Sequence, residues 1–446
     1  MARKFKSMDG NEAAAYVSYA YTEVAGIYPI TPSSPMADHV DQWAAQGRKN
    51  IFGTPVKVVE MESEAGAAGT VHGSLGAGAL TTTYTASQGL LLMIPNMYKI
   101  AGEQLPGVFH VSARCVASHA LNIFGDHSDV MACRQTGFAM LAEGNVQEVM
   151  DLSPVAHLAA IEGKTPFLNF FDGFRTSHEI QKVAMWDYKD LAEMCDMDAV
   201  QAFRDQRAQP LSHPHTPRQP RERRHLLPEP RGLQQGLRRA SAVRRGLHEE
   251  DQREARHRYG LFNYYGAPDA DRVVVCMGSF CDVLEEVIDY LNAHGEKVGL
   301  VKVRLFRPFS IKHFVDVLPE TVQKIAVMDR TKEPGSIGEP LYQDVVSALY
   351  EAGKTGIKVV GGRYGLGSKD TPPASAFAVF EELKKDEPKR EFTIGIVDDV
   401  TNLSCPGRGC AQHCSPRHHR VQVLGSGRRR YRRCQQELHQ DHRRPH

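Results

Sequence analysis

The chain has 446 residues, of which 41% are hydrophobic and 24% charged, so it is long enough for roughly two or three domains with cores of their own. It contains no apolar run of about eighteen residues and no signal-peptide-like start, which argues against a membrane partner and favours a cytoplasmic location. The formal net charge of +1 excludes a uniformly basic or acidic protein.

This small net charge is an average over unlike segments. Residues 206–258 and 405–446 together hold 23 arginines, no lysine and eight acidic residues, which gives +15, while the remaining chain carries −14. One hypothesis is that these segments are arginine-rich arms that bind nucleic acid. The second segment would then also offer a zinc site, with the ligands Cys405, Cys410, Cys414, His418 and His419.

The alternative is translation in the wrong frame of a GC-rich gene, in which arginine codons are common and lysine codons are rare. Back-translation of residues 225–239, read one base later, permits IYFQNREASNKAYDA, and the tail permits CKFWGLGADGTVGANK. Long stop-free runs of ordinary composition rarely arise by chance. We therefore assign both segments to frame errors and set aside the zinc and nucleic-acid hypotheses.

Through residues 8–205, apolar strand-like runs alternate with helical patterns. The predicted strands are 51–62, 78–87, 106–114 and 165–173, and the predicted helices are 11–25, 63–78, 89–102 and 153–163. Such alternation predicts a parallel α/β sheet with helices on both faces.

Residues 259–404 repeat the pattern. Here the predicted strands are 272–279, 297–306, 324–331 and 357–365, and the predicted helices are 284–295 and 340–353. The fold class is therefore α/β with two parallel-sheet domains, 1–258 and 259–404, followed by 405–446 as a remnant that leads into a third. Each strand ends in a polar or glycine-rich loop, so we expect any chemistry at the carboxyl ends of the sheets.

The nine cysteines show no paired spacing, which indicates reduced thiols rather than a disulfide framework. Five of them lie in mostly apolar surroundings, namely Cys115, Cys133, Cys195, Cys276 and Cys281.

The first polar strand end is GIYPITPSSPMAD, residues 26–38, which carries the hydroxyls of Thr31, Ser33 and Ser34. Its three prolines fix the backbone and remove amide donors, so the loop either turns a corner or holds those hydroxyls toward a ligand. The second is VVEMESEAGAAG, in which Glu62 and Glu64 precede small residues that open a helix. A carboxylate there is either a helix cap or an acid–base group, and these residues alone favour the cap.

The third strand end carries Arg114, which would either clamp a carboxylate through two parallel hydrogen bonds or form a surface salt bridge. Asp126 and His127 follow it, as a general-base pair or, more often for such a pair, as a loop closure. The fourth comprises residues 329–340 and 361–370, where glycines with arginine and lysine would either seat a phosphate or simply form turns. Neither contains a nucleotide-binding fingerprint.

Taken together, these strings resemble the N-terminal part of pyruvate:ferredoxin (flavodoxin) oxidoreductases. The resemblance covers residues 4–205 and 259–404 and also the frame-corrected stretches. It rests on YPITPSSP, EMESEAGAAG, TASQGLLLMIPNMYKI, GVFHVSAR, FGDHSD, RQTGFAML, FFDGFRTSHE, RTKEPG and GRYGLGSKD.

The resemblance implies a homodimeric enzyme that oxidatively decarboxylates pyruvate with thiamine diphosphate and Mg2+. Electrons would pass through [4Fe-4S] clusters to ferredoxin or flavodoxin, and the acetyl group would go to coenzyme A. The first domain would be the pyrimidine-binding half of the thiamine site, and the second would be similar to the transketolase C-terminal domain.

By the same resemblance, Glu64 matches the glutamate that hydrogen-bonds the aminopyrimidine ring, and Pro29 lies at the cofactor. Thr31 and Arg114 match the residues that hold the keto oxygen and the carboxylate of pyruvate. The chain has no GDG-type motif for Mg2+ and diphosphate and no CxxCxxCxxxC run, so we predict no metal ligand. We expect a fragment that does not turn over pyruvate alone.

Two rival hypotheses are another 2-oxoacid:ferredoxin oxidoreductase subunit and a non-catalytic protein whose arginine-rich arms bind RNA or DNA. FFDGFRTSHE and RTKEPG favour the pyruvate enzyme over the first rival. The second rival predicts lysine among the arginines and no coherent second frame, and both predictions fail.

Overall fold

A computed structural model of the chain describes residues 3–118, 120–206, 259–397 and 400–405. The two segments assigned to frame errors lie outside the described residues apart from their first members, Gln206 and Cys405. So do the other four candidate zinc ligands. The described residues belong to a single compact unit that spans 1–407.

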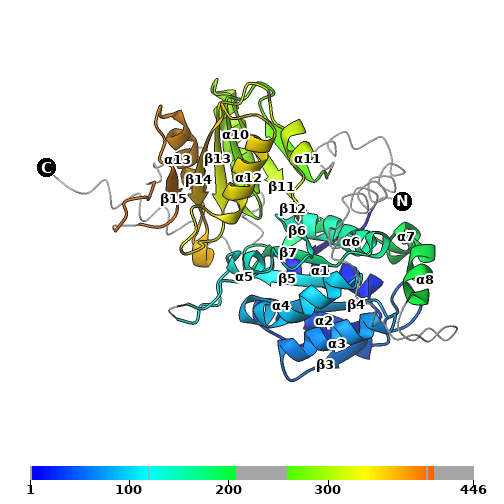
Figure 1. Ribbon diagram of the computed structural model, residues 1–446. Helices are drawn as coiled ribbons and strands as arrows, with labels where there is room; N and C mark the ends of the chain where they lie inside the picture. The colour runs from blue at the N-terminus through cyan, green and yellow to red at the C-terminus, as the bar shows by residue number, and fades with distance from the viewer. Residues whose placement is uncertain (1–2, 119, 207–258, 398–399, 406–446) are drawn as a thin grey trace, which may run out of the picture. The chain divides into compact units, whose positions relative to one another are not determined.

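The first sheet has seven strands in the order β12-β6-β7-β5-β4-β2-β3 (Figure 1). All neighbours are parallel except β12 and β6. Its strands are β2 (Val24–Ile27), β3 (Lys57–Glu60), β4 (Thr81–Thr85), β5 (Val108–Ala113), β6 (Ala139–Glu143), β7 (Phe167–Asp172) and β12 (Leu305–Arg307). The central strands β4, β5, β6 and β7 are buried along their whole length, so they form the core of this part.

Eight helices accompany this sheet in the described residues. They are α1 (Gly10–Tyr21), α2 (Ser34–Ala45), α3 (Glu64–Gly76), α4 (Ser87–Gly102), α5 (Ser128–Ala132), α6 (Val146–Gly163), α7 (Tyr188–Met194) and α8 (Met197–Asp205). With right-handed crossovers, the strand order places α2 and α6 on one face and α3, α4 and α5 on the other. The contacts agree, because α1 packs on α2 and α6, whereas α4 packs on α3 and α5.

The prediction of a helix over residues 11–25 was partly wrong. Helix α1 begins after the cap Asp9, whose side chain accepts the Glu12 N–H, but it ends at Tyr21. The apolar run that follows is the short strand β2, which lies between β4 and β3. A four-residue apolar strand directly after an apolar helix has no periodicity of its own, so the two merge in the sequence pattern.

The second sheet has six strands in the order β15-β14-β13-β10-β11-β9. They are β9 (Phe262–Gly266), β10 (Arg272–Cys276), β11 (Val298–Val303), β13 (Lys324–Asp329), β14 (Lys358–Arg363) and β15 (Glu391–Thr393), parallel except for β9. Its helices are α10 (Phe280–Ala293), α11 (Ile311–Asp316), α12 (Pro340–Glu351) and α13 (Pro373–Lys384), with a 3-10 turn at Leu366–Ser368. The predicted α/β class with two mainly parallel sheets is confirmed.

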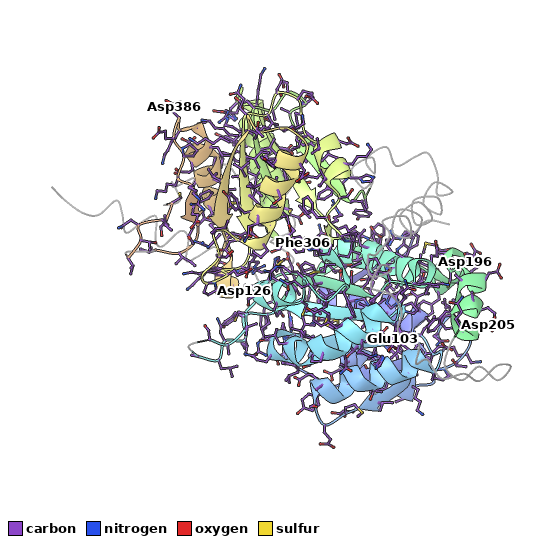
Figure 2. The ribbon with its side chains drawn as sticks, in the orientation of Figure 1. Glu103, Asp126, Asp196, Asp205, Phe306 and Asp386 are labelled. Atoms are coloured by element: carbon purple, nitrogen blue, oxygen red, sulfur yellow. The ribbon has the colours of Figure 1, made fainter. Side chains whose placement is uncertain are left out.

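Two pairings lie outside the predicted plan. Strands β1 (Phe5–Met8) and β8 (Gln181–Ala184) form a separate antiparallel ribbon. Strand β12 follows the second-sheet strand β11 in the chain but pairs with β6 of the first sheet, and its Phe306, labelled in Figure 2, is fully buried. The domain boundary near residue 258 stays a prediction.

Two expectations from composition can be compared with the structure. The five cysteines expected to be reduced are buried and free of disulfides, and so is Cys405. Across the described ranges, every helix is too short or too polar to cross a lipid bilayer.

Candidate functional site

Three of the predicted site residues follow strands of one half of the first sheet, in which the order is β5-β4-β2-β3. Thr31 follows β2, Glu64 follows β3 and Arg114 follows β5. Because the strands from β3 to β5 are all parallel, their carboxyl ends form a single edge, and the three residues lie on it. The structure therefore brings to one edge what the sequence places more than 30 residues apart.

Glu64 is the first residue of α3, but it does not cap this helix. The cap is Ser63, whose hydroxyl accepts the Gly66 N–H at 3.1 Å, so the interpretation of Glu64 as a cap was wrong. The Glu64 side chain is only 8% exposed, and its carboxylate has no hydrogen-bond or ion-pair partner among the described residues. Neither Glu64 oxygen is among the fully buried side-chain atoms that lack a partner, so this carboxylate reaches the surface from an otherwise buried residue and is open to a ligand.

The Glu64 carboxylate lies against Gly89 in the first turn of α4. A Cβ atom at Gly89 would be 2.7 Å from both Cγ and Oε1 of Glu64, and 2.8 Å from Oγ1 of Thr85. The Thr83 and Thr85 hydroxyls on β4 are buried and have no hydrogen-bond partner among the described residues. The absence of a side chain at Gly89 thus leaves room for the carboxylate, next to the Thr85 hydroxyl, which is still able to bond.

Arg114 is 5% exposed, which excludes the surface salt bridge considered from the sequence. Its Nη1 donates to the carbonyl oxygen of Thr31 at 2.9 Å, and its Nε donates to the carbonyl oxygen of Asn122 at 3.1 Å. In the described part of the chain, no carboxylate pairs with this guanidinium. The remaining N–H donors are therefore available for an anionic ligand.

Asp129 fixes the backbone around Arg114, and the sequence reasoning missed it. Its Oδ2 accepts the N–H groups of Arg114 at 3.0 Å and Ser87 at 2.7 Å, and its Oδ1 accepts its neighbour Val130 N–H at 2.7 Å. Burial raises the pKa of Asp129 to about 7. The carboxyl group thus ties the end of β5 to the turn that begins α4, where Ser87 has a left-handed φ of 52°.

The proline-rich loop both ends a strand and begins a helix. The Ser33 hydroxyl donates to the Ile30 carbonyl oxygen at 2.8 Å, and α2 starts at Ser34 with Pro35 in its first turn. Thr31 and Pro29 are exposed, and the Thr31 hydroxyl has no partner among the described residues. Ser33 is therefore used within the loop, while Thr31 remains available.

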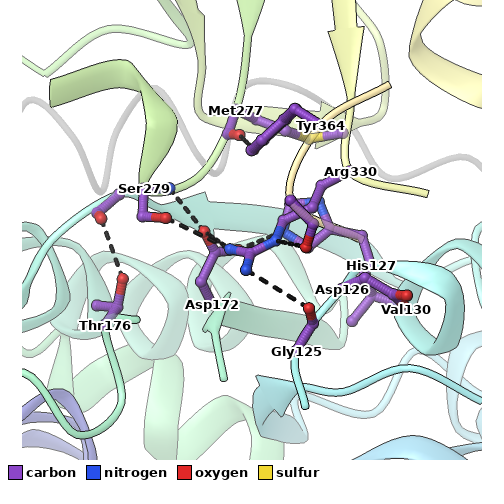
Figure 3. A network of polar contacts seen from close by, with 12 residues as sticks. Gly125, Asp126, His127, Val130, Asp172, Thr176, Met277, Ser279, Arg330 and Tyr364 are labelled. Carbon is purple, nitrogen blue, oxygen red and sulfur yellow. Dashed lines mark hydrogen bonds and ion pairs between the residues drawn. The ribbon is translucent and has the colours of Figure 1, made fainter. Parts of the chain in front are cut away.

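Asp126 and His127 do not pair with each other. Oδ1 of Asp126 accepts the Ser128 N–H at 2.9 Å and the Ser128 hydroxyl at 2.7 Å, so Asp126 closes the loop. His127 Nε2 instead contacts Oδ1 of Asp172 at 2.5 Å (Figure 3). The general-base hypothesis for this pair is not supported.

Asp172 ends β7 and is the centre of a buried ionic network that also includes the second sheet. Its Oδ2 pairs with the guanidinium of Arg330 and accepts the Ser279 N–H at 2.8 Å (Figure 3). Burial opposes ionisation, but the charges of Arg330 and His127 hold the pKa of Asp172 well below its usual range. Arg330 comes from the RTKEPG string, so this cation is already neutralised by the protein.

Two further groups from the loops considered for a phosphate site, Arg363 and Asp329, are also used internally. Arg363 Nε pairs with Glu339 at 2.5 Å. Asp329 accepts the N–H groups of Leu341 and Tyr342 at 3.0 and 3.1 Å in the first turn of α12, and burial raises its pKa to about 8. These contacts favour the turn-forming interpretation of the two loops.

Comparison with known proteins identifies the family of the chain. The family model "Pyruvate flavodoxin/ferredoxin oxidoreductase, thiamine diP-bdg" matches residues 16–234, and "Pyruvate:ferredoxin oxidoreductase core domain II" matches residues 270–374. The chain thus combines a thiamine-diphosphate-binding domain with a second core domain. It belongs to the pyruvate:ferredoxin/flavodoxin oxidoreductase family.

Individual relatives give the extent of the match. The chain is 60% identical over 410 residues to the pyruvate:ferredoxin oxidoreductase of Moorella thermoacetica, covering 90% of this chain and 34% of that protein. It is 59% identical over 416 residues to the pyruvate-flavodoxin oxidoreductase of Klebsiella pneumoniae, covering 91% and 34%. The chain therefore spans about a third of the length of these relatives. A pyruvate-flavodoxin oxidoreductase from a Nostoc species, 52% identical, is covered to 98%.

Among solved structures, the fold is similar to a 2-oxoglutarate:ferredoxin oxidoreductase from Magnetococcus marinus, determined with 2-oxoglutarate, coenzyme A and succinyl-CoA bound. The TM-score is 0.60 at 19% identity, covering 85% of this chain and 65% of that one. The predicted family is confirmed, and the identities favour the pyruvate enzyme over the other 2-oxoacid enzymes.

Proposed function

We propose that this chain supplies the pyrimidine-binding half of a thiamine diphosphate site, in an enzyme that converts pyruvate to acetyl-CoA and CO2 and reduces ferredoxin or flavodoxin. The observation that carries the proposal is Glu64, a residue only 8% exposed whose carboxylate has no partner among the described residues. When bound, thiamine diphosphate supplies the electron sink that decarboxylation of a 2-oxoacid requires. The intact enzyme is proposed to be a homodimer that also carries Mg2+ and [4Fe-4S] clusters and binds no nucleic acid.

Glu64 is proposed to hold a proton at a ring nitrogen of the aminopyrimidine. The unpartnered carboxylate and the Cβ-free position at Gly89 support this role, because a flat ring fits best where no side chain projects. The Thr85 hydroxyl, which has no partner among the described residues, adds bonding capacity beside it. Pro29 would contact the cofactor from the end of β2.

Thr31 and Arg114 are proposed to hold pyruvate. The guanidinium would bind the carboxylate and keep it in place until CO2 leaves, and the Thr31 hydroxyl would donate to the keto oxygen. The 2.9 Å bond from Arg114 to the Thr31 carbonyl supports a joint role, because it couples the two residues directly. In a buried site such charge-assisted bonds are stronger than in water.

We further propose that the 446-residue chain alone does not turn over pyruvate. It has neither a GDG-type motif for Mg2+ and diphosphate nor a cysteine run for iron–sulfur clusters. An assay of pyruvate-dependent viologen reduction by the purified chain should therefore give no rate above background. A rate that depends on pyruvate would overturn this part of the proposal.

Calorimetric titration of the chain with thiamine diphosphate tests the cofactor half-site. Gly89→Ala should weaken binding at least tenfold, because the added Cβ displaces the Glu64 carboxylate. Gly69→Ala is the matched control, since a Cβ at this α3 position meets nothing within 4 Å and both changes raise helix propensity. Equal affinity of both variants, or a wild-type chain that does not bind, would contradict the proposal.

A further inference from the structure

The loop between Arg114 and His127 is held at its far end by the second sheet. Gly125 donates its N–H to the hydroxyl of Ser368 at 2.7 Å, and Ser368 donates its own N–H to the Gly125 carbonyl oxygen at 2.8 Å. The His127 N–H donates to the Arg330 carbonyl oxygen at 2.8 Å. Two residues that follow strands of the second sheet thus fix a loop of the first.

Ser368 has an unusual backbone for this contact. Its φ is 56°, in the left-handed region, and it lies in a turn with Gly365 and Gly367, whose φ values are 60° and 55°. A non-glycine residue there costs of the order of 1 kcal/mol and is kept where its surroundings require it. Glycine would suit this backbone better, but it would lack the hydroxyl that accepts the Gly125 N–H.

Gly125 is held firmly on its other side as well. A Cβ at this position would be 2.5 Å from the Gly173 carbonyl oxygen and 3.1 Å from that of Ala113. Arg330 Nη2 adds a long contact of 3.4 Å to the Gly125 carbonyl oxygen. Gly125 is therefore a fixed point between β5, β7 and the second sheet.

A short series of bonds leads from this fixed point to the Arg114 guanidinium. The Phe124 carbonyl oxygen accepts the Cys115 N–H at 3.1 Å, and the Phe124 N–H donates to Oδ1 of Asn122 at 3.0 Å. The Asn122 carbonyl oxygen then accepts Arg114 Nε at 3.1 Å. The orientation of the Arg114 guanidinium thus depends on the backbone position of Gly125.

We propose that Ser368 is a positioning residue for substrate binding. It acts through Gly125 and Asn122 to orient Arg114 toward the carboxylate of a small 2-oxoacid. The second α/β domain thereby supports the substrate-binding loop of the first without contacting the substrate. This inference rests on the proposed function only in taking Arg114 as the carboxylate-binding group.

Ser368→Gly in the 446-residue chain tests this role. Because glycine suits a φ of 56°, the variant should be as stable to urea as the wild type or more so. Amide hydrogen exchange of residues 120–125 should nevertheless become at least tenfold faster. Pyruvate affinity, measured by saturation-transfer NMR, should fall about fivefold.

Two further variants complete the design. Ser368→Asn should recover part of the protection, because asparagine tolerates the left-handed region and keeps an acceptor oxygen. Ser336→Ala is the matched control: its hydroxyl donates to the Gly338 carbonyl oxygen at 2.7 Å, so it should change neither exchange nor affinity.

The two proposals fail in different ways. Arg114→Ala should abolish pyruvate binding with little change in exchange at residues 120–125. If the wild-type chain does not bind pyruvate, the proposed substrate site fails. The exchange measurement still tests whether Ser368 fixes the loop at residues 120–125. Unchanged exchange and unchanged affinity in Ser368→Gly would overturn the inference.

Discussion

Charged residues at the carboxyl ends of β3 and β5 and those at the carboxyl ends of the second sheet are used in opposite ways. At the first sheet, Glu64 and Arg114 are buried and have no ionic partner among the described residues. At the second sheet, Arg330 pairs with Asp172, which ends β7 of the first sheet, and Arg363 pairs with Glu339. The same rule of parallel sheets places polar groups at strand ends in both cases. A charged strand-end residue without an ionic partner marks a candidate ligand site. One that is paired belongs to a structural joint, by which we mean the buried ion pairs around Asp172 and Arg330 that hold the fold together.

The largest effect should come from breaking the structural joint. Asp172→Asn leaves the Arg330 guanidinium, which is 2% exposed, without its counter-charge. Removing one member of a buried ion pair typically costs about 3–5 kcal/mol of unfolding free energy. Urea unfolding followed by circular dichroism measures it.

A surface pair gives the control for this change. Glu320 is an exposed partner of Lys354 at 3.5 Å, and Glu320→Gln should alter stability by less than about 0.5 kcal/mol. If Asp172→Asn were as mild as Glu320→Gln, the network in Figure 3 would not be a structural joint.

A change of stability with pH, of intermediate size, should come from Asp129, which lies beside the candidate functional site. Its folded-state pKa of about 7 lies above the ordinary value of 3.8, so the folded chain keeps a proton that the unfolded chain releases. The unfolding free energy should therefore fall as pH rises from about 4 to about 8, by on the order of 4 kcal/mol for this group, and change little at higher pH.

Asp129→Asn should remove this share of the pH dependence, because the amide does not titrate. Denaturant titrations of both proteins between pH 4 and pH 8 measure the difference. Parallel curves for the two proteins would show that Asp129 does not carry the expected proton.

A smaller effect is expected at the helix cap next to Glu64. Ser63→Ala removes the acceptor of the Gly66 N–H and should cost about 1 kcal/mol. Ser34→Ala is a suitable control, because that serine is the first residue of α2 and does not act as its cap. Thermal unfolding of the two variants compares them, and equal melting temperatures would count against the cap.

The smallest loss of stability, or even a gain, is expected for Glu64→Gln. A carboxylate held for a ligand contributes little to stability and is often costly, so its replacement by a neutral isostere should lower stability by less than about 0.5 kcal/mol. Urea unfolding measures this directly. A loss like that of Asp172→Asn would show that Glu64 has a structural partner.

Much of the fold could be predicted from the sequence, because buried parallel strands are apolar runs with clear ends. Strands β5, β7, β10 and β13 are of this kind. The antiparallel β12 and the β1–β8 ribbon were not predicted, since three- or four-residue strands with distant partners leave little local signal. These strands pair only when distant parts of the chain come together in the folded structure.

The sequence predicted which residues lie at the candidate site, but not the burial and hydrogen-bond partners of their side chains. Thr31, Glu64 and Arg114 drew attention because each follows a strand, but their roles were assigned from the family resemblance and stay predictions. The cap assignment of Glu64 failed because Ser63 competes for the same N–H donor. Nothing local distinguishes Asp129 or Ser368, since their importance lies in N–H groups contributed by other loops.

The pairing of β12 with β6 has a consequence for synthesis on the ribosome. Strand β6 ends at Glu143, but β12 begins only at Leu305, so the chain must grow by more than 150 further residues before that edge is paired. Until then β6 presents free N–H and C=O groups, which other strands recruit readily. A nascent first domain released early would be expected to aggregate through this edge, and residues 305–307 act as its built-in cover.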